Sequence, residues 1–189
     1  MKATIVLLAS VEAENYGRKL MLEAHRLGNV GFEMARLPQH VSLKQPFLIS
    51  SLEEMENFFD NFAKSISKQK IQMEELELCP NNAIGGIPSG CISIRVKQSE
   101  ELKALQRNLF EQLEVKFGPC PAEHDHDYVF HMTVAIGGAS FEAYKEAYDV
   151  LLKNEYKEEF VFDRLGLLYY DDDMITAGTY FCYKQIELS

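Results

Sequence analysis

Two short segments of the sequence place a histidine two residues before a hydroxyl side chain. The first reads His40-Val41-Ser42-Leu43 and the second reads His131-Met132-Thr133-Val134. An imidazole gains and loses a proton near neutral pH, so both segments carry a group suited to acid–base chemistry. Residues two apart in a β-strand share a face at a spacing of about 6.6 Å. Each segment is therefore interpreted as a polar pair on a strand whose alternate, apolar residues face a core.

Paired motifs of this form, one in each half of the chain, resemble the signature of the 2H phosphoesterase superfamily. The first motif lies in a longer segment, residues 39–47, which reads Gln-His-Val-Ser-Leu-Lys-Gln-Pro-Phe. This segment is similar to the His-h-Thr-Leu-Lys-x-Pro-Phe segment (h, apolar) of bacterial members related to 2′-5′ RNA ligases. The resemblance extends to the order of elements over most of the chain, and elsewhere it is one of pattern only.

The resemblance implies an enzyme that cleaves a phosphodiester, especially a 2′,3′-cyclic one, without a metal or another cofactor. It implies that His40 and His131 are the acid–base pair, one activating water and the other protonating the departing oxygen. It also implies that the hydroxyls of Ser42 and Thr133 donate hydrogen bonds to the non-bridging phosphate oxygens. Which histidine is the acid and which is the base stays open at this point.

Lys44 is a further candidate for phosphate binding. Strict alternation along the strand predicts that it shares a face with His40 and Ser42, although a solvated lysine at the strand end is an equal alternative. After Thr133 the chain reads Val-Ala-Ile-Gly-Gly. It therefore lacks the basic residue that some relatives carry there, which disfavours a long RNA substrate and ligase activity.

The spacing of apolar residues predicts the elements that position these motifs. Ser51 and Glu54 form a capping box at a helix start, and Ser140 is a candidate cap for another helix. The predicted helices span residues from about 12 to 28, 51–66, 100–117 and 140–153. The predicted strands span residues 3–9, 40–44, 71–78, 91–96, 129–135, 160–169 and 175–187. The segment 79–90 is expected to be a long connection, with a turn at Gly85-Gly86.

The order of these elements predicts an α+β fold with an internal duplication. Starting at each histidine, the chain reads strand, helix, strand, strand. Two similar β-α-β-β lobes are thus expected within a single two-lobed domain of residues 1–189, with the motifs at 40–43 and 131–134. Their antiparallel sheets should be related by a pseudo-twofold axis and face each other across a central cleft.

Composition narrows the classes of partner. The chain has 29 acidic and 19 basic residues and a formal net charge of −10. Long nucleic acids are bound mainly through Lys and Arg, so we expect a small phosphorylated nucleotide or an RNA terminus rather than a long duplex. The opening apolar run is too short for a signal peptide or a membrane span, so a cytoplasmic protein with no membrane partner is expected. The oligomeric state stays open.

Several other residues are assigned structural roles. The four cysteines are expected to be reduced thiols, with a Cys79–Cys91 bridge as the minor alternative. The cluster from Glu123 to Asp127, which contains His124 and His126, could bind Zn²⁺ or Mn²⁺, but a solvated polar loop is favoured, with a gating or substrate-contacting loop as a minor alternative. Asp171-Asp172-Asp173 is expected to be a hairpin turn in solvent, and His25 a structural or surface residue.

Aromatic residues are candidates for stacking on a nucleobase. Tyr128 and Phe130 are assigned to the core, because strand alternation places them with Met132. Four tyrosines near the C-terminus could line the cleft, without an indication of which do so: Tyr169, Tyr170, Tyr180 and Tyr183.

The sequence thus predicts a cyclic phosphodiesterase that acts on a 2′,3′-cyclic nucleotide or RNA terminus. Three alternatives stay open. One is a nucleotide- or RNA-binding module with little turnover, and another is a metal-dependent phosphohydrolase that uses residues 123–127. The last is a 2′-5′ RNA ligase, which would run the same phosphodiester chemistry in reverse.

Overall fold

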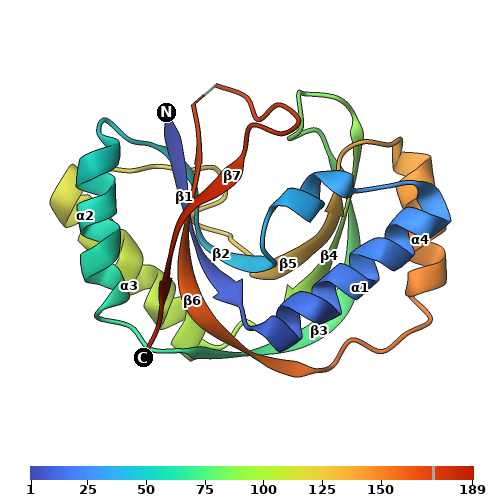
Figure 1. Ribbon diagram of the computed structural model, residues 1–189, viewed down its shortest axis with the longest axis horizontal. Helices are drawn as coiled ribbons and strands as arrows, with labels where there is room; N and C mark the ends of the chain where they lie inside the picture. The colour runs from blue at the N-terminus through green and yellow to red at the C-terminus, as the bar shows by residue number, and fades with distance from the viewer. Residues whose placement is uncertain (172) are drawn as a thin grey trace.

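The computed structural model describes residues 1–171 and 173–189, and within them the chain forms four α-helices, one 3₁₀ helix and seven β-strands (Figure 1). Asp172, in the predicted turn 171–173, lies outside the described residues. The α+β class predicted from the sequence is confirmed. The elements in chain order are β1 (Lys2–Ala9), α1 (Val11–Gly28), η1 (Phe32–Arg36), β2 (His40–Leu48), α2 (Leu52–Ala63), β3 (Gln69–Asn81), β4 (Ser89–Val96), α3 (Glu100–Phe117), β5 (His131–Ile136), α4 (Phe141–Leu151), β6 (Glu159–Tyr170) and β7 (Phe181–Glu187).

Serine caps fix the starts of three helices. The Ser51 hydroxyl accepts a hydrogen bond from the Glu54 amide at 3.3 Å, and Ser140 accepts one from Ala143 at 3.4 Å. Ser99 caps α3 in the same way, through the Leu102 amide at 3.2 Å. Each cap satisfies one of the amides that a helix leaves unpaired at its N-terminus, which stabilises the helix by about 1 kcal/mol. The predicted starts of α2 and α4 are confirmed.

The strands form one antiparallel sheet in the order β1-β2-β5-β4-β3-β6-β7, and β1 also pairs with β6. The extended pairings fall into two groups. The first lobe contains β2, β1, β6 and β7, and the second lobe contains β5, β4 and β3. The lobes are joined by one residue pair between β2 and β5, Val41 with Met132, and by four pairs between β3 and β6. Helices α2 and α3 cover the outside of the first lobe, and α1 and α4 cover the second (Figure 1).

Strand register reveals the repeat. In β1–β2, Val6 pairs with Ser42 and Ile5 with Lys44, so Leu43 is an extra residue in a β-bulge. In β4–β5, Ser93 pairs with Thr133 and Ile92 with Ala135, so Val134 is the equivalent extra residue. The repeats therefore align as β1-α1-β2-α2-β3 and β4-α3-β5-α4-β6, with β7 added at the end.

The β-α-β-β repeats predicted from the sequence began at β2 and β5. The repeats of the structure begin one strand and one helix earlier, at β1 and β4. Strands β1 and β4 carry no motif, so nothing in their residues indicated that they open the repeats. In each repeat the last strand also crosses over: β3 pairs with β4 in the second lobe, and β6 pairs with β1 in the first. Each lobe is therefore built from both halves of the chain.

The segment between Cys79 and Cys91 is more regular than predicted. Strand β3 runs on to Asn81 and β4 begins at Ser89, so only residues 82–88 connect them, with positive φ at the turn glycines Gly85 and Gly86. The two cysteines are cross-strand partners, and both are free thiols, as are the remaining two. Among the described residues, no helix combines the length and apolar character that crossing a bilayer requires.

Candidate active site

A cleft of about 580 Å³ lies between the lobes, and both histidine motifs line it. His40 and Ser42 come from β2, and His131 and Thr133 come from β5. The volume falls within the range of roughly 300–1,000 Å³ that is usual for small-molecule sites. The pairing of Val41 with Met132 brings the two strands together between the motifs. Residues from distant parts of the sequence therefore meet in one site.

The two imidazoles are oriented in the same way. His40 Nδ1 lies 2.9 Å from the Pro38 carbonyl oxygen, and His131 Nδ1 lies 2.8 Å from the Val129 carbonyl oxygen. Because a carbonyl only accepts, Nδ1 carries the hydrogen in both rings. Each neutral ring then has its acceptor nitrogen at Nε2. Both repeats use the carbonyl two residues upstream, so the backbone fixes the tautomer of each histidine.

His40 and His131 differ in their surroundings. His40 is buried, whereas His131 is partly exposed. Burial lowers the pKa of His40, and the nearby His131 lowers it further. The Pro38 carbonyl and Glu14 oppose this shift. Near neutral pH, His40 is therefore held in the form that can accept a proton.

The bulges after the hydroxyl residues decide which side chains face the cleft. Ser42 and Lys44 pair with adjacent residues of β1, so they point to opposite faces of the sheet. Gln45 lines the cleft instead, and Ile136 occupies the equivalent place after the second bulge. The prediction that Lys44 shares a face with His40 and Ser42 is wrong, because strict alternation does not hold across a bulge.

Lys44 instead contacts Asp125 and two aromatic rings. Its side chain is 2% exposed, and its ammonium forms an ion pair with Asp125. It also lies 5.6 Å from the Phe47 ring centroid and 4.5 Å from that of Phe110. These groups compensate the charge in a separate cavity, of about 300 Å³, on the other side of β2. The Lys44 side chain therefore lines the second cavity and not the cleft that contains the histidine motifs.

Asp125 holds the loop that precedes β5. Its carboxylate also accepts a hydrogen bond from the Ala122 amide at 2.9 Å. On one side of this anchor His124 lines the cleft, and on the other His126 lines the second cavity. The two histidines of the predicted metal cluster thus diverge. Among the described residues, no group of three His, Cys, Asp or Glu side chains is arranged to hold a metal ion.

Tyr128, on the same loop, packs against the core as predicted, but it also lines the cleft. Residues 128–130 precede the strand, which begins at His131, and alternation therefore does not apply to them. The Tyr128 ring centroid lies 5.7 Å from that of His131, and the hydroxyl faces Ser42 and Gln45. Burial raises the pKa of Tyr128, which keeps the phenol neutral and able to donate.

The predictions for the remaining aromatic residues have different outcomes. Phe130 is 1% exposed in the core, as predicted. Of the four candidate tyrosines, Tyr180 lines the cleft, whereas Tyr169, Tyr170 and Tyr183 are not among the residues that form it. Tyr170 instead packs edge-on against Tyr180, at 5.4 Å between centroids. Of these four tyrosines, Tyr180 therefore remains as a candidate for contact with a nucleobase.

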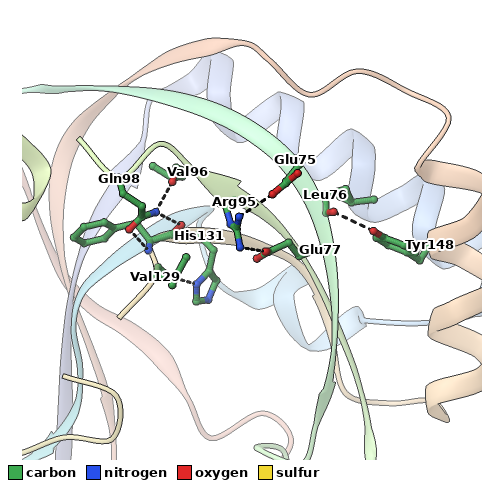
Figure 2. A network of polar contacts seen from close by, with 10 residues as sticks. Glu75, Leu76, Glu77, Arg95, Val96, Gln98, Val129, His131 and Tyr148 are labelled. Atoms are coloured by element: carbon green, nitrogen blue, oxygen red, sulfur yellow. Dashed lines mark hydrogen bonds and ion pairs between the residues drawn. The ribbon is translucent and has the colours of Figure 1, made fainter. Parts of the chain in front are cut away.

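Two arginines in the cleft were not predicted from the sequence. Arg95 is the cross-strand partner of His131 and forms ion pairs with Glu75 at 2.8 Å and Glu77 at 2.5 Å. Figure 2 shows its guanidinium between these carboxylates, close to the His131 ring. Arg36, at the end of η1, is the other cation of the cleft. Neither lies in a motif, and only the register of β4 with β5 could have indicated Arg95.

The fold is similar to those of several solved structures, whereas none of the curated proteins compared matches the sequence. The match to TT0787 of Thermus thermophilus covers 100% of this chain and 98% of the TT0787 chain, at 13% sequence identity and a TM-score of 0.62. Escherichia coli LigT complexed with 3′-AMP matches with the same coverage, at 12% identity and a TM-score of 0.60. Usb1 of Kluyveromyces marxianus matches 96% of both chains, at 11% identity and a TM-score of 0.51.

These identities establish the likeness of fold alone. A family model gives the stronger result, because it matches residues 21–174, which contain both histidine motifs. The match spans most of the sequence and agrees with the resemblance of the motifs to 2H phosphoesterases. The chain belongs to the 2′-5′ RNA ligase superfamily.

Proposed function

We propose that the protein is a metal-independent phosphodiesterase that opens the 2′,3′-cyclic phosphate of a nucleotide or RNA terminus. The main support is the pair of equivalently anchored histidines in one cleft, each beside a hydroxyl residue. Membership of the superfamily supports the same class of chemistry. LigT, a structural relative, has been crystallised with 3′-AMP, NADP⁺ and ATP, so this fold can bind nucleotides.

The difference between the histidines suggests their roles. His40, whose pKa is lowered by burial, would accept the proton of the attacking water at Nε2. His131, which is closer to solvent, would donate a proton from Nε2 to the ribose oxygen that leaves phosphorus. Water adds to phosphorus, one P–O bond breaks, and the product is a phosphomonoester beside a free hydroxyl.

Hydroxyl groups would stabilise the charge that builds on the phosphoryl oxygens. Ser42 and Thr133 line the cleft on the same strands as the histidines. Tyr128, kept neutral by burial, faces Ser42 and can add a third donor. Donors fixed before the reaction are effective because they need no reorganisation as charge develops.

Turnover of a panel of 2′,3′-cyclic nucleotides tests the proposal. The protein is expected to hydrolyse at least one member, and the rate should be unchanged by EDTA, since the assigned groups are protein side chains. Products are resolved by chromatography. Activity that EDTA abolishes and Zn²⁺ or Mn²⁺ restores would instead support the metal-dependent alternative. Tight nucleotide binding without turnover would support a binding module.

The pH dependence of kcat/KM tests the assignment of the base. A base must be deprotonated to act, so activity should rise with pH through the pKa of His40. Because burial lowers that pKa, the midpoint of the rise should lie below the ordinary histidine value of 6.5. Initial rates measured from acidic to mildly alkaline pH at constant ionic strength give the midpoint. A midpoint at or above the ordinary value would contradict the assignment of His40 as base.

A further inference from the structure

The two arginines that line the cleft differ in whether carboxylates of the protein form ion pairs with them. Among the described residues that line the cleft, Arg36 and Arg95 are the only lysine or arginine residues. Arg95 is bound by Glu75 and Glu77, so its charge is neutralised within the protein. No ion pair or hydrogen bond of the described residues involves the Arg36 side chain, which is exposed to the cleft. Arg36 therefore has no ion-pair partner among the described residues, although Glu33 and Asp127 also line the cleft, and its guanidinium is free to contact an anionic ligand.

Arg36 lies toward the end of the cleft that loops cover. The helix η1 packs at the end of β5, where the Gly31 amide donates to the Gly137 carbonyl at 3.3 Å. Arg36 itself lies at the other end of η1, four residues before His40, so at most about 14 Å separate the Cα atoms of these two residues.

The β6–β7 loop covers Arg36. A Cβ atom at Gly178 would lie 2.6 Å from Arg36 Nη1, so the guanidinium lies against the backbone of this glycine, and a larger residue here would displace it. Gly178 also has φ of 84°, which favours glycine. The same loop contacts the β3–β4 connection from the other lobe, through the Gly85 amide and the Ile175 carbonyl at 2.7 Å. Two loops thus enclose the Arg36 end of the cleft.

We propose that Arg36 binds a second phosphate of the substrate, on the 5′ side of the ribose whose cyclic phosphate is opened. This inference rests on the proposed function. A guanidinium can contact two phosphate oxygens at once, and a partly enclosed, unpaired arginine is well suited to such a contact. The favoured substrate is then a 2′,3′-cyclic nucleotide whose 5′ oxygen carries a phosphate, either free or as the phosphodiester of an RNA 3′ end.

Three matched substrates test this proposal. They are adenosine 2′,3′-cyclic phosphate, its 5′-phosphorylated form, and the adenylyl dinucleotide with a 2′,3′-cyclic phosphate. For the wild-type protein, kcat/KM should be about tenfold higher for at least one of the two substrates with a second phosphate, the scale of one charge-assisted contact. The substrate that shows the preference identifies the source of the second phosphate. No preference for either would overturn the proposal.

Substitutions connect the preference to Arg36. Arg36→Gln should lower kcat/KM for the preferred substrate to the level of adenosine 2′,3′-cyclic phosphate and leave the latter within twofold. Arg36→Lys keeps the charge and should retain most of the preference. Arg26→Gln changes an exposed arginine of α1 outside the cleft and serves as the matched control. An equal loss on all three substrates in Arg36→Gln would overturn the proposal, since Arg36 would then act on the nucleobase or the scissile phosphate.

A binding measurement separates this inference from the proposed function. Titration calorimetry compares adenosine 3′-monophosphate with adenosine 3′,5′-bisphosphate, neither of which requires turnover. The bisphosphate should bind about tenfold more tightly to the wild-type protein and lose that advantage in Arg36→Gln. If no cyclic nucleotide is hydrolysed but this difference is found, the proposed function fails and the Arg36 site stands. Equal binding of the two ligands would overturn the Arg36 site.

Discussion

Replacement of His40 or His131 by alanine should lower kcat for a 2′,3′-cyclic nucleotide by at least about 10², the scale of general acid–base catalysis. Each variant removes one of the two groups that we propose exchange protons with water and the departing oxygen. The double variant should be little slower than either single variant, because the residues act as a unit. Steady-state rates on purified protein, with circular dichroism to verify folding, measure the effect.

His126→Ala is the matched control for this experiment. His126 is exposed and lines the second cavity instead of the cleft, so its loss should leave kcat within twofold. Full activity in either His40→Ala or His131→Ala would remove that histidine from the mechanism. Such a result would leave the cleft as a binding site whose chemistry depends on other groups.

Removal of Asp125 should have the largest effect on stability. Asp125→Ala leaves the Lys44 ammonium, which is 2% exposed, without its counter-ion, and this should cost about 3 kcal/mol in the free energy of unfolding. Lys44→Met should cost less, about 1 kcal/mol, because methionine fills similar space and the Asp125 carboxylate keeps its hydrogen bond from the Ala122 amide. Urea unfolding at neutral pH compares the two variants.

The double variant Lys44→Met/Asp125→Ala completes this test. It should be more stable than Asp125→Ala alone, since no buried charge is then left unpaired. A greater loss in Lys44→Met than in Asp125→Ala would mean that packing of the lysine stem, and not the ion pair, dominates. Activity should fall in Asp125→Ala as well, because this carboxylate anchors the loop that carries Tyr128 to the cleft.

Much of the secondary structure could be predicted because local signals agreed with one another. Helix α2 has both a serine cap and an apolar stripe, and its buried residues are the ones that the spacing indicates: Met55, Phe58, Phe59 and Phe62. The histidine motifs could be predicted because each lies within one strand and needs only alternation over three residues. The strands themselves matched expectation within a few residues, except that β7 begins at Phe181 and not near residue 175.

Features that depend on contacts between distant strands could not be predicted. The bulge at Leu43 has no signature in the sequence, yet it moves Lys44 to the opposite face of the sheet. The contact of Tyr128 with the cleft was missed because the point where the strand begins is set by pairing with β4. Arg95 belongs to the cleft only through its register with His131. In each case the deciding information is a hydrogen-bonded partner far away in the sequence.

The crossing of β3 and β6 between the lobes has a consequence for the spacing of the histidines. Each half of the polypeptide contributes one strand to the lobe that holds the motif of the other half. The two halves are therefore interlocked, as the subunits of a domain-swapped dimer are. Widening the gap between the imidazoles would require unpairing β3 from β6 or β2 from β5. We therefore expect the chain to fold as one unit, with the distance between His40 and His131 determined by the connectivity of the backbone.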